Sequence, residues 1–258
     1  MKNLTKAMTI ILLISLLFSC SENSYSSKEK IRIFVSWPGG EGMPHYQWKK
    51  GEVKPTGIEP TFIERVLEIA ELDYEYITDY DAENVGDPRI ESIVKEEADI
   101  SIRGITINEA RKKQVLFTNS YYTDGLSALV RKSDSLETVE DLVGKKVYAL
   151  EFTTAYPWAK ENLKESAVLT YSKYDTNFIQ PENLLLKNEI DAYIIDKSFL
   201  NYIVQFHPEL GVMSSKFTEE NIGIAVSKNK PELVEKLNRA MKEMRQTGEF
   251  DQLLIGLN

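Results

Sequence analysis

The chain has 258 residues, enough for one large domain or two lobes of ordinary size. Its composition is that of a globular protein, with 42% apolar residues, and 31 Lys and Arg against 40 Asp and Glu give a formal charge of −9. This acidic balance argues against a nucleic-acid partner. One cysteine and two distant histidines exclude an intrachain disulfide and predict no metal site, and we expect no cofactor.

The N-terminal segment has the pattern of a secretory signal. A positively charged start precedes an apolar run over residues 7–19, which is shorter than the roughly 20 residues of a membrane-spanning helix. The run ends in LFSC, which resembles the lipobox of bacterial lipoproteins, where the cysteine is lipidated. We therefore predict a signal peptide over residues 1–19, lipidation of Cys20 and a polar tether over residues 20–30. The alternative is an ordinary signal peptide with a coincidental cysteine.

Strand and helix patterns alternate along the rest of the chain. The sequence Thr138-Val-Glu-Asp141 has the form of a capping box. Strands are expected over residues 31–35, 74–77, 99–105, 146–150, 168–171, 191–195 and 222–226. Helices are expected over residues 62–70, from 87 onward, after 108, and over 155–163, 183–188, 198–206 and 231–247.

This order predicts an α/β protein with parallel sheets and right-handed crossovers. The middle block has the pattern of a second α/β lobe inserted into the first. We expect residues 31–122 and 221–258 to form lobe 1 and residues 123–220 to form lobe 2. Two such lobes place a ligand cleft at the carboxyl ends of their strands and close by hinge motion, but this architecture does not name the ligand.

Arg111 is the first candidate for ligand binding. Asn108 is a good helix N-cap, so Arg111 falls in the first turn of a helix. A guanidinium binds a carboxylate through two parallel hydrogen bonds, and the nearby Thr106 hydroxyl and the free amides of the helix start add donors. The alternative is that Arg111 belongs with Lys112 and Lys113 to a solvated basic patch.

Two further candidates follow strands of the middle block. Thr153 and Thr154 lie at a strand-to-helix turn, where they form either an anion-facing nest or an ordinary N-cap. Asp196 ends an apolar strand, where it either meets a cation in the cleft or caps the helix at Ser198. Together a guanidinium, two donor groups and one carboxylate complement a zwitterion such as an α-amino acid, with contacts from both lobes linking binding to closure.

The segment DISIRGITINEARKKQVLFTNSYY, from residue 99 to 122, is similar to the signature of the polar amino-acid solute-binding proteins. The similarity extends to residues 57–59, 153–154, 191–196 and 223–248. It implies a periplasmic-binding-protein-like α/β fold of two lobes, each a mostly parallel sheet flanked by helices. It also implies a monomer on the periplasmic or extracellular face, without enzymatic activity, that delivers a small amino acid or similar zwitterion to an ABC permease. The lipid anchor would hold it on the membrane surface.

The resemblance also implies a role for each polar candidate. The arginine that matches Arg111 binds the α-carboxylate of the ligand, and the acid that matches Asp196 receives its α-ammonium group. The residues that assist match Thr106, Thr153, Thr154 and, through its carbonyl, Gly104.

An aromatic residue of lobe 1 packs on the ligand side chain in that family, and Trp37, Tyr46 and Trp48 are the candidates here. The sequence departs from the family pattern in three places. The loop from Trp37 to Thr56 is longer and richer in glycine and aromatic residues than that pattern. Arg103 stands where a small residue is usual, and Phe152 stands where a glycine is expected. A second positive group at Arg103 suggests the hypothesis of an acidic ligand side chain.

Two other functions stay open at this point. A few proteins of this superfamily are dehydratases of prephenate-like acids, which require a general acid, and Glu59 and Glu151 are the candidates for it. The third possibility is an amino-acid sensor that acts with a separate signalling protein.

Overall fold

The computed structural model describes residues 29–35, 41–42, 45–49, 51–77, 86–170 and 180–257. The predicted signal peptide, Cys20, Trp37 and most of the predicted tether lie outside these residues. Every helix in the described part of the chain falls short of the length and apolar character that a membrane span requires.

Lobe 1 is built on a five-stranded sheet in the order β4-β1-β5-β14-β6. Its strands are β1 (Ile31–Phe34), β4 (Tyr74–Tyr76), β5 (Ile100–Ser101), β6 (Leu116–Phe117) and β14 (Ala225–Val226). Its helices are α2 (Ile58–Ile69), α3 (Pro88–Val94), α4 (Glu109–Lys112), α8 (Pro231–Thr247), α9 (Glu249–Leu254) and the 3₁₀ turn η3 (Ile255–Leu257). A short hairpin of β2 (Glu41–Gly42) and β3 (Tyr46–Gln47) precedes α2.

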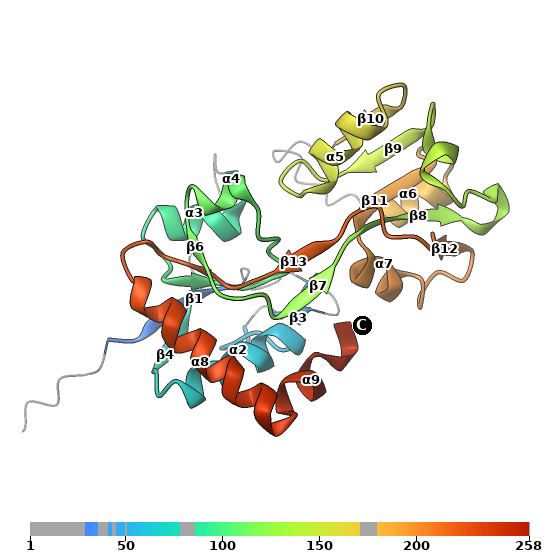
Figure 1. Ribbon diagram of the computed structural model, residues 1–258. Helices are drawn as coiled ribbons and strands as arrows, with labels where there is room; N and C mark the ends of the chain where they lie inside the picture. Colours follow the sequence, from blue (N-terminus) through green and yellow to red (C-terminus); the bar gives the residue numbers. More distant parts are fainter. Residues whose placement is uncertain are drawn as a thin grey trace, which may run out of the picture.

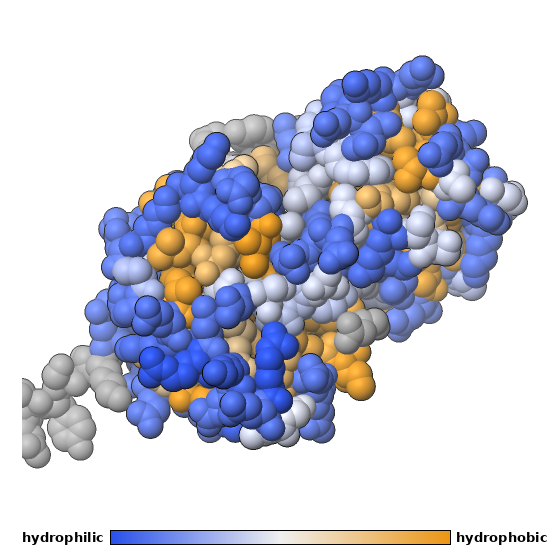
Figure 2. All heavy atoms as spheres, viewed as in Figure 1, coloured by the Kyte–Doolittle hydropathy of each residue, from blue (hydrophilic) through white to orange (hydrophobic). Residues whose placement is uncertain are grey.

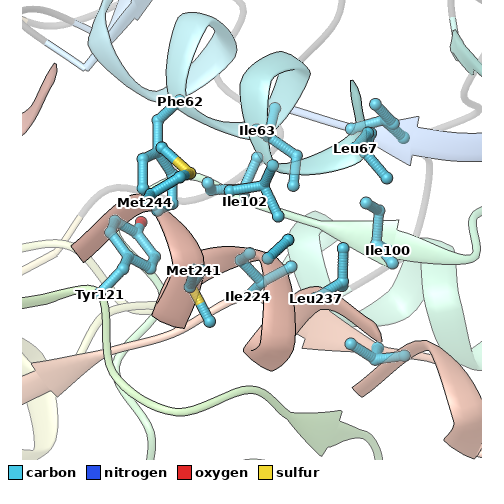
Figure 3. Close-up of a cluster of buried hydrophobic side chains, with 14 of the residues drawn as sticks. Phe62, Ile63, Leu67, Ile100, Ile102, Tyr121, Ile224, Leu237, Met241 and Met244 are labelled. Atoms are coloured by element: carbon cyan, nitrogen blue, oxygen red, sulfur yellow. The ribbon is translucent and has the colours of Figure 1, made fainter. Parts of the chain in front are cut away.

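The alternation of apolar residues in β1 places them on both faces of this sheet. Ile31 and Ile33 belong to the core that α2 and α8 cover, whereas Phe34 belongs to a smaller core with α3. Figure 3 shows the larger core, where Phe62 of α2 and Met244 of α8 meet over the sheet. Helix α8 has the predicted bounds and ends at Gly248, whose positive φ of 78° closes the C-terminus as glycine allows.

Lobe 2 is built on a second five-stranded sheet in the order β10-β9-β11-β8-β12. Its strands are β8 (Leu126–Arg131), β9 (Lys146–Ala149), β10 (Ala167–Leu169), β11 (Ala192–Asp196) and β12 (Leu210–Val212). Its helices are α5 (Ala155–Asn162), α6 (Pro181–Leu186) and α7 (Lys197–Ile203), with the 3₁₀ turns η1 (Lys132–Asp134) and η2 (Val139–Leu142). The predicted capping box is confirmed at η2, where Thr138 N donates to Asp141 Oδ2 at 2.9 Å.

Four of the five strands in each sheet run in the same direction, as expected for a mostly parallel sheet, and one strand in each runs against them. The antiparallel pairings all involve β8 in lobe 2 and β14 in lobe 1. These are the strands by which the chain enters a lobe after crossing from the other one. They therefore run antiparallel to the neighbouring strands, which are connected by helical crossovers within the lobe.

Two antiparallel strands join the lobes (Figure 1). They are β7 (Tyr122–Asp124) and β13 (Glu220–Ile222), paired with Glu220 opposite Asp124. Gly125 follows β7 at a close approach, because a Cβ atom there would lie 1.9 Å from the carbonyl oxygen of Thr218. The face of the molecule in Figure 2 is largely hydrophilic, with apolar residues in separate patches.

Candidate ligand-binding site

A pocket of about 230 Å³ lies between the two lobes. Lobe 1 lines it with residues that include Asp87 and Arg111, and lobe 2 lines it with residues 151–154. A larger hollow of about 500 Å³ is lined by residues 30, 68 and 71–74 of lobe 1 alone, none of which is a predicted site residue. The interlobe pocket is therefore the candidate site.

Arg111 is buried in this site rather than part of a solvated patch. The Asn108 side chain caps α4 as predicted and accepts a hydrogen bond from Arg111 N at 2.9 Å. Arg111 is only 8% exposed, and its guanidinium donates to the Thr106 carbonyl at 2.9 Å and to Asp87 Oδ2 at 2.9 Å. Burial and the nearby Arg89 lower the pKa of Arg111, and the charges of Asp87 and Asp196 oppose this shift.

Asp87 and Arg89 were not predicted as site residues, but Asp87 lines the interlobe pocket and Arg89 is bound to it. Asp87 caps α3 and binds the Arg89 guanidinium through both carboxylate oxygens, at 2.7 and 2.8 Å. Arg89 Nη1 in turn donates to the carbonyls of Arg103 at 3.0 Å and Gly104 at 3.3 Å. Burial opposes the charge of Asp87, but Arg89 and Arg111 outweigh it and lower the pKa of Asp87. Arg111, Asp87 and Arg89 thus form a chain of ion pairs on lobe 1.

Glu220 is a third residue with a role near the site that was not predicted from the sequence. Its Oε2 atom accepts hydrogen bonds from Thr106 Oγ1 at 2.5 Å and from Thr154 Oγ1 at 2.9 Å. The structure therefore brings Thr106 and Thr154 together, as predicted for a shared anion, but the anion between them belongs to the chain. Thr154 stands at the N-cap position of α5 without capping it. The Thr153 hydroxyl instead donates to the Leu150 carbonyl at 2.7 Å within its own turn.

Asp196 ends β11 in lobe 2 and carries an oxygen without a donor. It stands at the N-cap position of α7, but its side chain makes no cap hydrogen bond. Its Oδ1 atom is buried and accepts no hydrogen bond from any described residue. Burial, together with the charges of Asp124 and Glu220, raises the pKa of Asp196 to about 7. A cation beside this carboxylate would restore its ordinary ionisation.

Behind Gly104 lies a buried ion pair of lobe 1. His45 Nδ1 lies 3.3 Å from Glu59 Oε2, and Glu59 also accepts hydrogen bonds from the Gly104 amide at 2.7 Å and from the Tyr121 hydroxyl. Burial opposes both charges, but the pair outweighs it, raising the pKa of His45 and lowering that of Glu59. His45 Nε2 reaches Ser198 Oγ of lobe 2 at 3.1 Å.

The described aromatic candidates lie in lobe 1 and do not line the interlobe pocket. Tyr46 is 2% exposed, and the guanidinium of Arg103 lies 4.7 Å from its ring centroid. Trp48 is fully buried, with its Nε1 donating to the Glu52 carbonyl at 3.1 Å. Within the described ranges, no group of three or more His, Cys, Asp or Glu side chains is arranged to hold a metal ion.

The chain matches one protein family over most of its length. Residues 40–255 match the model of the bacterial extracellular solute-binding proteins, family 3. The chain belongs to this family. This membership confirms the predicted resemblance, and the two-lobe α/β fold is confirmed by the solved structures that the chain resembles.

The family 3 chain is similar to the ABC transporter glutamine-binding protein GlnH of Bacillus subtilis (strain 168), with 30% identity over 166 residues. That match covers 64% of this chain but only 59%, less than two thirds, of GlnH. The L-cystine-binding protein TcyJ of Escherichia coli (strain K12) is 26% identical over 229 residues, covering 88% of this chain and 82% of TcyJ. A solved ancestral arginine-binding protein bound to arginine has a TM-score of 0.73 and 27% identity, covering 87% of this chain and 96% of that one.

Proposed function

We propose that this family 3 protein captures an amino-acid zwitterion between its lobes and delivers it to an ABC permease. The relatives are named for amino acids, namely glutamine and L-cystine, and a similar solved protein holds arginine. These ligands share an α-carboxylate and an α-ammonium group and differ in their side chains. The proposal therefore concerns the shared zwitterion.

One observation carries the proposal: Arg111, a buried guanidinium that lines the interlobe pocket from lobe 1, is close enough to the unsatisfied carboxylate of Asp196 in lobe 2 for the two charges to interact. Arg111 supplies donors for the ligand carboxylate. Asp196 Oδ1 accepts no hydrogen bond from the described residues, and an ammonium group supplies the missing donor and charge. Because the two residues belong to different lobes, a bound zwitterion favours the closed arrangement.

The dehydratase alternative finds no support at Glu59. A general acid needs a pKa near the working pH, whereas the contacts of Glu59 with His45, Tyr121 and the Gly104 amide lower its pKa. Glu59 therefore serves as a fixed carboxylate that holds the Gly104 amide in place. Glu151 is exposed at the rim of the pocket.

A thermal-shift screen of the twenty common L-amino acids tests the proposal. A hundredfold excess over Kd stabilises a protein by about 2.7 kcal/mol, which raises Tm by about 5 to 10 °C in a chain of this size. Arg111→Ala should abolish the shift, while the matched Arg239→Ala, on the exposed side of α8, should keep it. The proposal is wrong if no amino acid shifts Tm, or if Arg111→Ala responds like the parent.

We also propose that Arg103 favours an acidic ligand side chain. Its guanidinium lies over the Tyr46 ring, a contact that orients the positive group without neutralising it. Arg103→Ala should reduce the affinity for L-glutamate more than that for L-glutamine, as measured by calorimetric titration. An unchanged ratio of the two affinities would remove this role.

Membrane attachment through Cys20 completes the proposed function. The apolar run before Cys20 and the lipobox-like sequence support it. Cys20→Ser should release the protein from the membrane fraction of cells that express the full chain. Retention of the variant in that fraction would contradict lipid anchoring.

A further inference from the structure

The carboxylate of Glu220 binds one hydroxyl from each lobe. Its Oε2 atom accepts from Thr106 Oγ1 of lobe 1 at 2.5 Å and from Thr154 Oγ1 of lobe 2 at 2.9 Å. Thr106 is 8% exposed and Glu220 is 6% exposed, so this contact is shielded from water. Glu220 belongs to β13, one of the two strands that join the lobes. A single oxygen atom on a connecting strand thus ties the lobes together across the site.

In lobe 1 too, side chains of the protein are bonded to groups that we propose as partners of the ligand. The Arg111 guanidinium, the proposed partner of the ligand carboxylate, donates to Asp87 Oδ2 at 2.9 Å. The Gly104 carbonyl, the proposed partner of the ligand ammonium, accepts from Arg89 at 3.3 Å. Among the described residues proposed to bind the zwitterion, Asp196 has a buried side-chain oxygen without a donor.

A ligand carboxylate and the Glu220 carboxylate compete for the same hydrogen atoms. A threonine hydroxyl has one hydrogen to donate, so Thr106 and Thr154 cannot both serve Glu220 and a second carboxylate. Two carboxylates that share one pair of donors also repel each other. Glu220 and a ligand carboxylate therefore cannot accept hydrogen bonds from these two hydroxyls at the same time.

We propose that Glu220, supported by Asp87 on Arg111, is an internal competitor that sets the affinity of the site for carboxylate ligands. This inference rests on the proposed function. The Glu220 bonds hold the lobes closed with both threonine hydroxyls occupied, and a ligand carboxylate reaches these hydroxyls only from the state in which Glu220 has released them. The measured Kd is then larger than the intrinsic Kd by the inverse of the fraction of competent molecules.

Glu220→Gln tests this competition, because glutamine keeps the shape of the side chain and removes the charge. Two charge-assisted hydrogen bonds are weakened, so the affinity for a carboxylate ligand should rise about tenfold or more. The probes are L-glutamine, L-arginine and L-cystine, titrated by calorimetry into the full-length protein. Glu219→Gln is the matched control, since Glu219 is the adjacent and exposed residue, and its Kd should equal that of the parent.

A second measurement needs no amino acid. In small-angle X-ray scattering without added solute, Glu220→Gln should have a larger radius of gyration than the parent and the Glu219→Gln control, because the tie between the lobes is weakened. Thr154→Val removes the lobe 2 hydroxyl and keeps Glu220, and it should give the same increase. It also replaces Glu220→Gln in this measurement if that variant fails to fold.

The two measurements separate the failure of this inference from the failure of the proposed function. The inference is overturned if the Kd of Glu220→Gln is equal to or larger than that of the parent. It is also overturned if both variants have the same radius of gyration as the parent. If neither the parent nor Glu220→Gln responds to any of the twenty common L-amino acids in the thermal-shift screen, the proposed function fails. The scattering result then still decides whether Glu220 ties the lobes.

Discussion

Arg111 Nη2 lies 2.9 Å from Asp87 Oδ2, so the arginine proposed to bind the ligand carboxylate already has a carboxylate partner within lobe 1. Asp87 also binds Arg89 through both of its oxygens. One carboxylate therefore lies between two guanidinium groups, and the cluster keeps one excess positive charge. That excess charge is suited to an anionic ligand group.

Asp87→Asn should destabilise the protein by about 3 kcal/mol, because it leaves two buried guanidinium groups without their shared anion. Asparagine still caps α3, so the loss does not come from the cap. The lowered pKa of Asp87 means that its contribution is present above its ordinary pKa of 3.8 and is lost as the pH falls below that value. Thermal unfolding between pH 3 and pH 7 measures this, and the difference between parent and variant should shrink toward pH 3.

The control for this prediction is Asp141→Asn, a cap substitution in the exposed η2 turn of lobe 2. It should cost about 1 kcal/mol or less. An Asp87→Asn variant as stable as this control would show that the Arg111–Asp87–Arg89 cluster contributes little to folding.

Binding of an amino acid should depend on pH through Asp196. Its pKa of about 7 leaves roughly a tenth of the molecules ionised at pH 6 and roughly nine tenths at pH 8. A ligand ammonium requires the ionised form, so the affinity should rise about tenfold between these pH values. Calorimetry in two buffers of different ionisation enthalpy should detect proton release near pH 6. Asp196→Asn should bind weakly at both pH values, and a parent with equal affinity at both would contradict the ammonium assignment.

Glu59→Gln should destabilise the protein by about 3–5 kcal/mol, because it leaves a buried imidazolium without its partner. Because the pKa of His45 is raised, its charge contributes fully to the stability of the fold below its ordinary pKa of 6.5. This contribution is lost as the pH rises through the raised pKa. Because the pKa of Glu59 is lowered, its charge contributes fully to the stability of the fold above its ordinary pKa of 4.5, and this contribution is lost as the pH falls through the lowered pKa. The pair therefore stabilises most between about pH 4.5 and 6.5.

Thermal unfolding from pH 4 to pH 9 checks this window. Glu68→Gln, at an exposed position of the same helix, is the control and should cost less than about 1 kcal/mol. A Glu59→Gln variant whose difference in Tm from the parent does not vary with pH would show that His45 carries no charge in the folded protein.

Gly125→Ala should disturb the connection between the lobes. A Cβ atom at this position lies 1.9 Å from the Thr218 carbonyl oxygen, so the two connecting segments must move apart, at a cost of about 1–3 kcal/mol. Gly211→Ala is the control, because its Cβ atom meets only the flexible side chain of Lys132, at 3.3 Å. Urea unfolding measures both variants. Equal stability of the two would mean that the connecting segments adapt without strain.

Local patterns predicted the elements whose signals lie within one stretch of sequence. Helix α8 has the predicted bounds because its apolar spacing, its proline at the start and its terminal glycine all act locally. Strand β8 was not predicted, since it is buried along nearly its whole length between α5 on one face and α7 on the other and so shows no alternation. The predicted strand over 99–105 is formed only at Ile100–Ser101.

The candidate site was predictable where one segment holds the signal. The N-cap at Asn108 follows from a single short motif, whereas the spacing left Arg111 open between a ligand site and a solvated patch, and the structure buries it. Asp87 was recognised only as a helix start, and Glu220 is one acid in an acidic pair with nothing local to distinguish it. Their roles come from partners that are distant along the chain, 24 residues for Asp87 and 114 and 66 residues for Glu220.

The amino-acid sequence by itself determined the family, the two-lobe α/β architecture and the zwitterion-binding hypothesis, because these rest on periodicity and on short motifs. Only the tertiary structure decided which strand of each sheet runs against the others, the burial of Tyr46 and Trp48 and the partners of the polar site residues. The physical reason is that a hydrogen bond or an ion pair forms with whichever group the folded chain brings within about 3 Å. That proximity is a property of the packed lobes and not of any one segment.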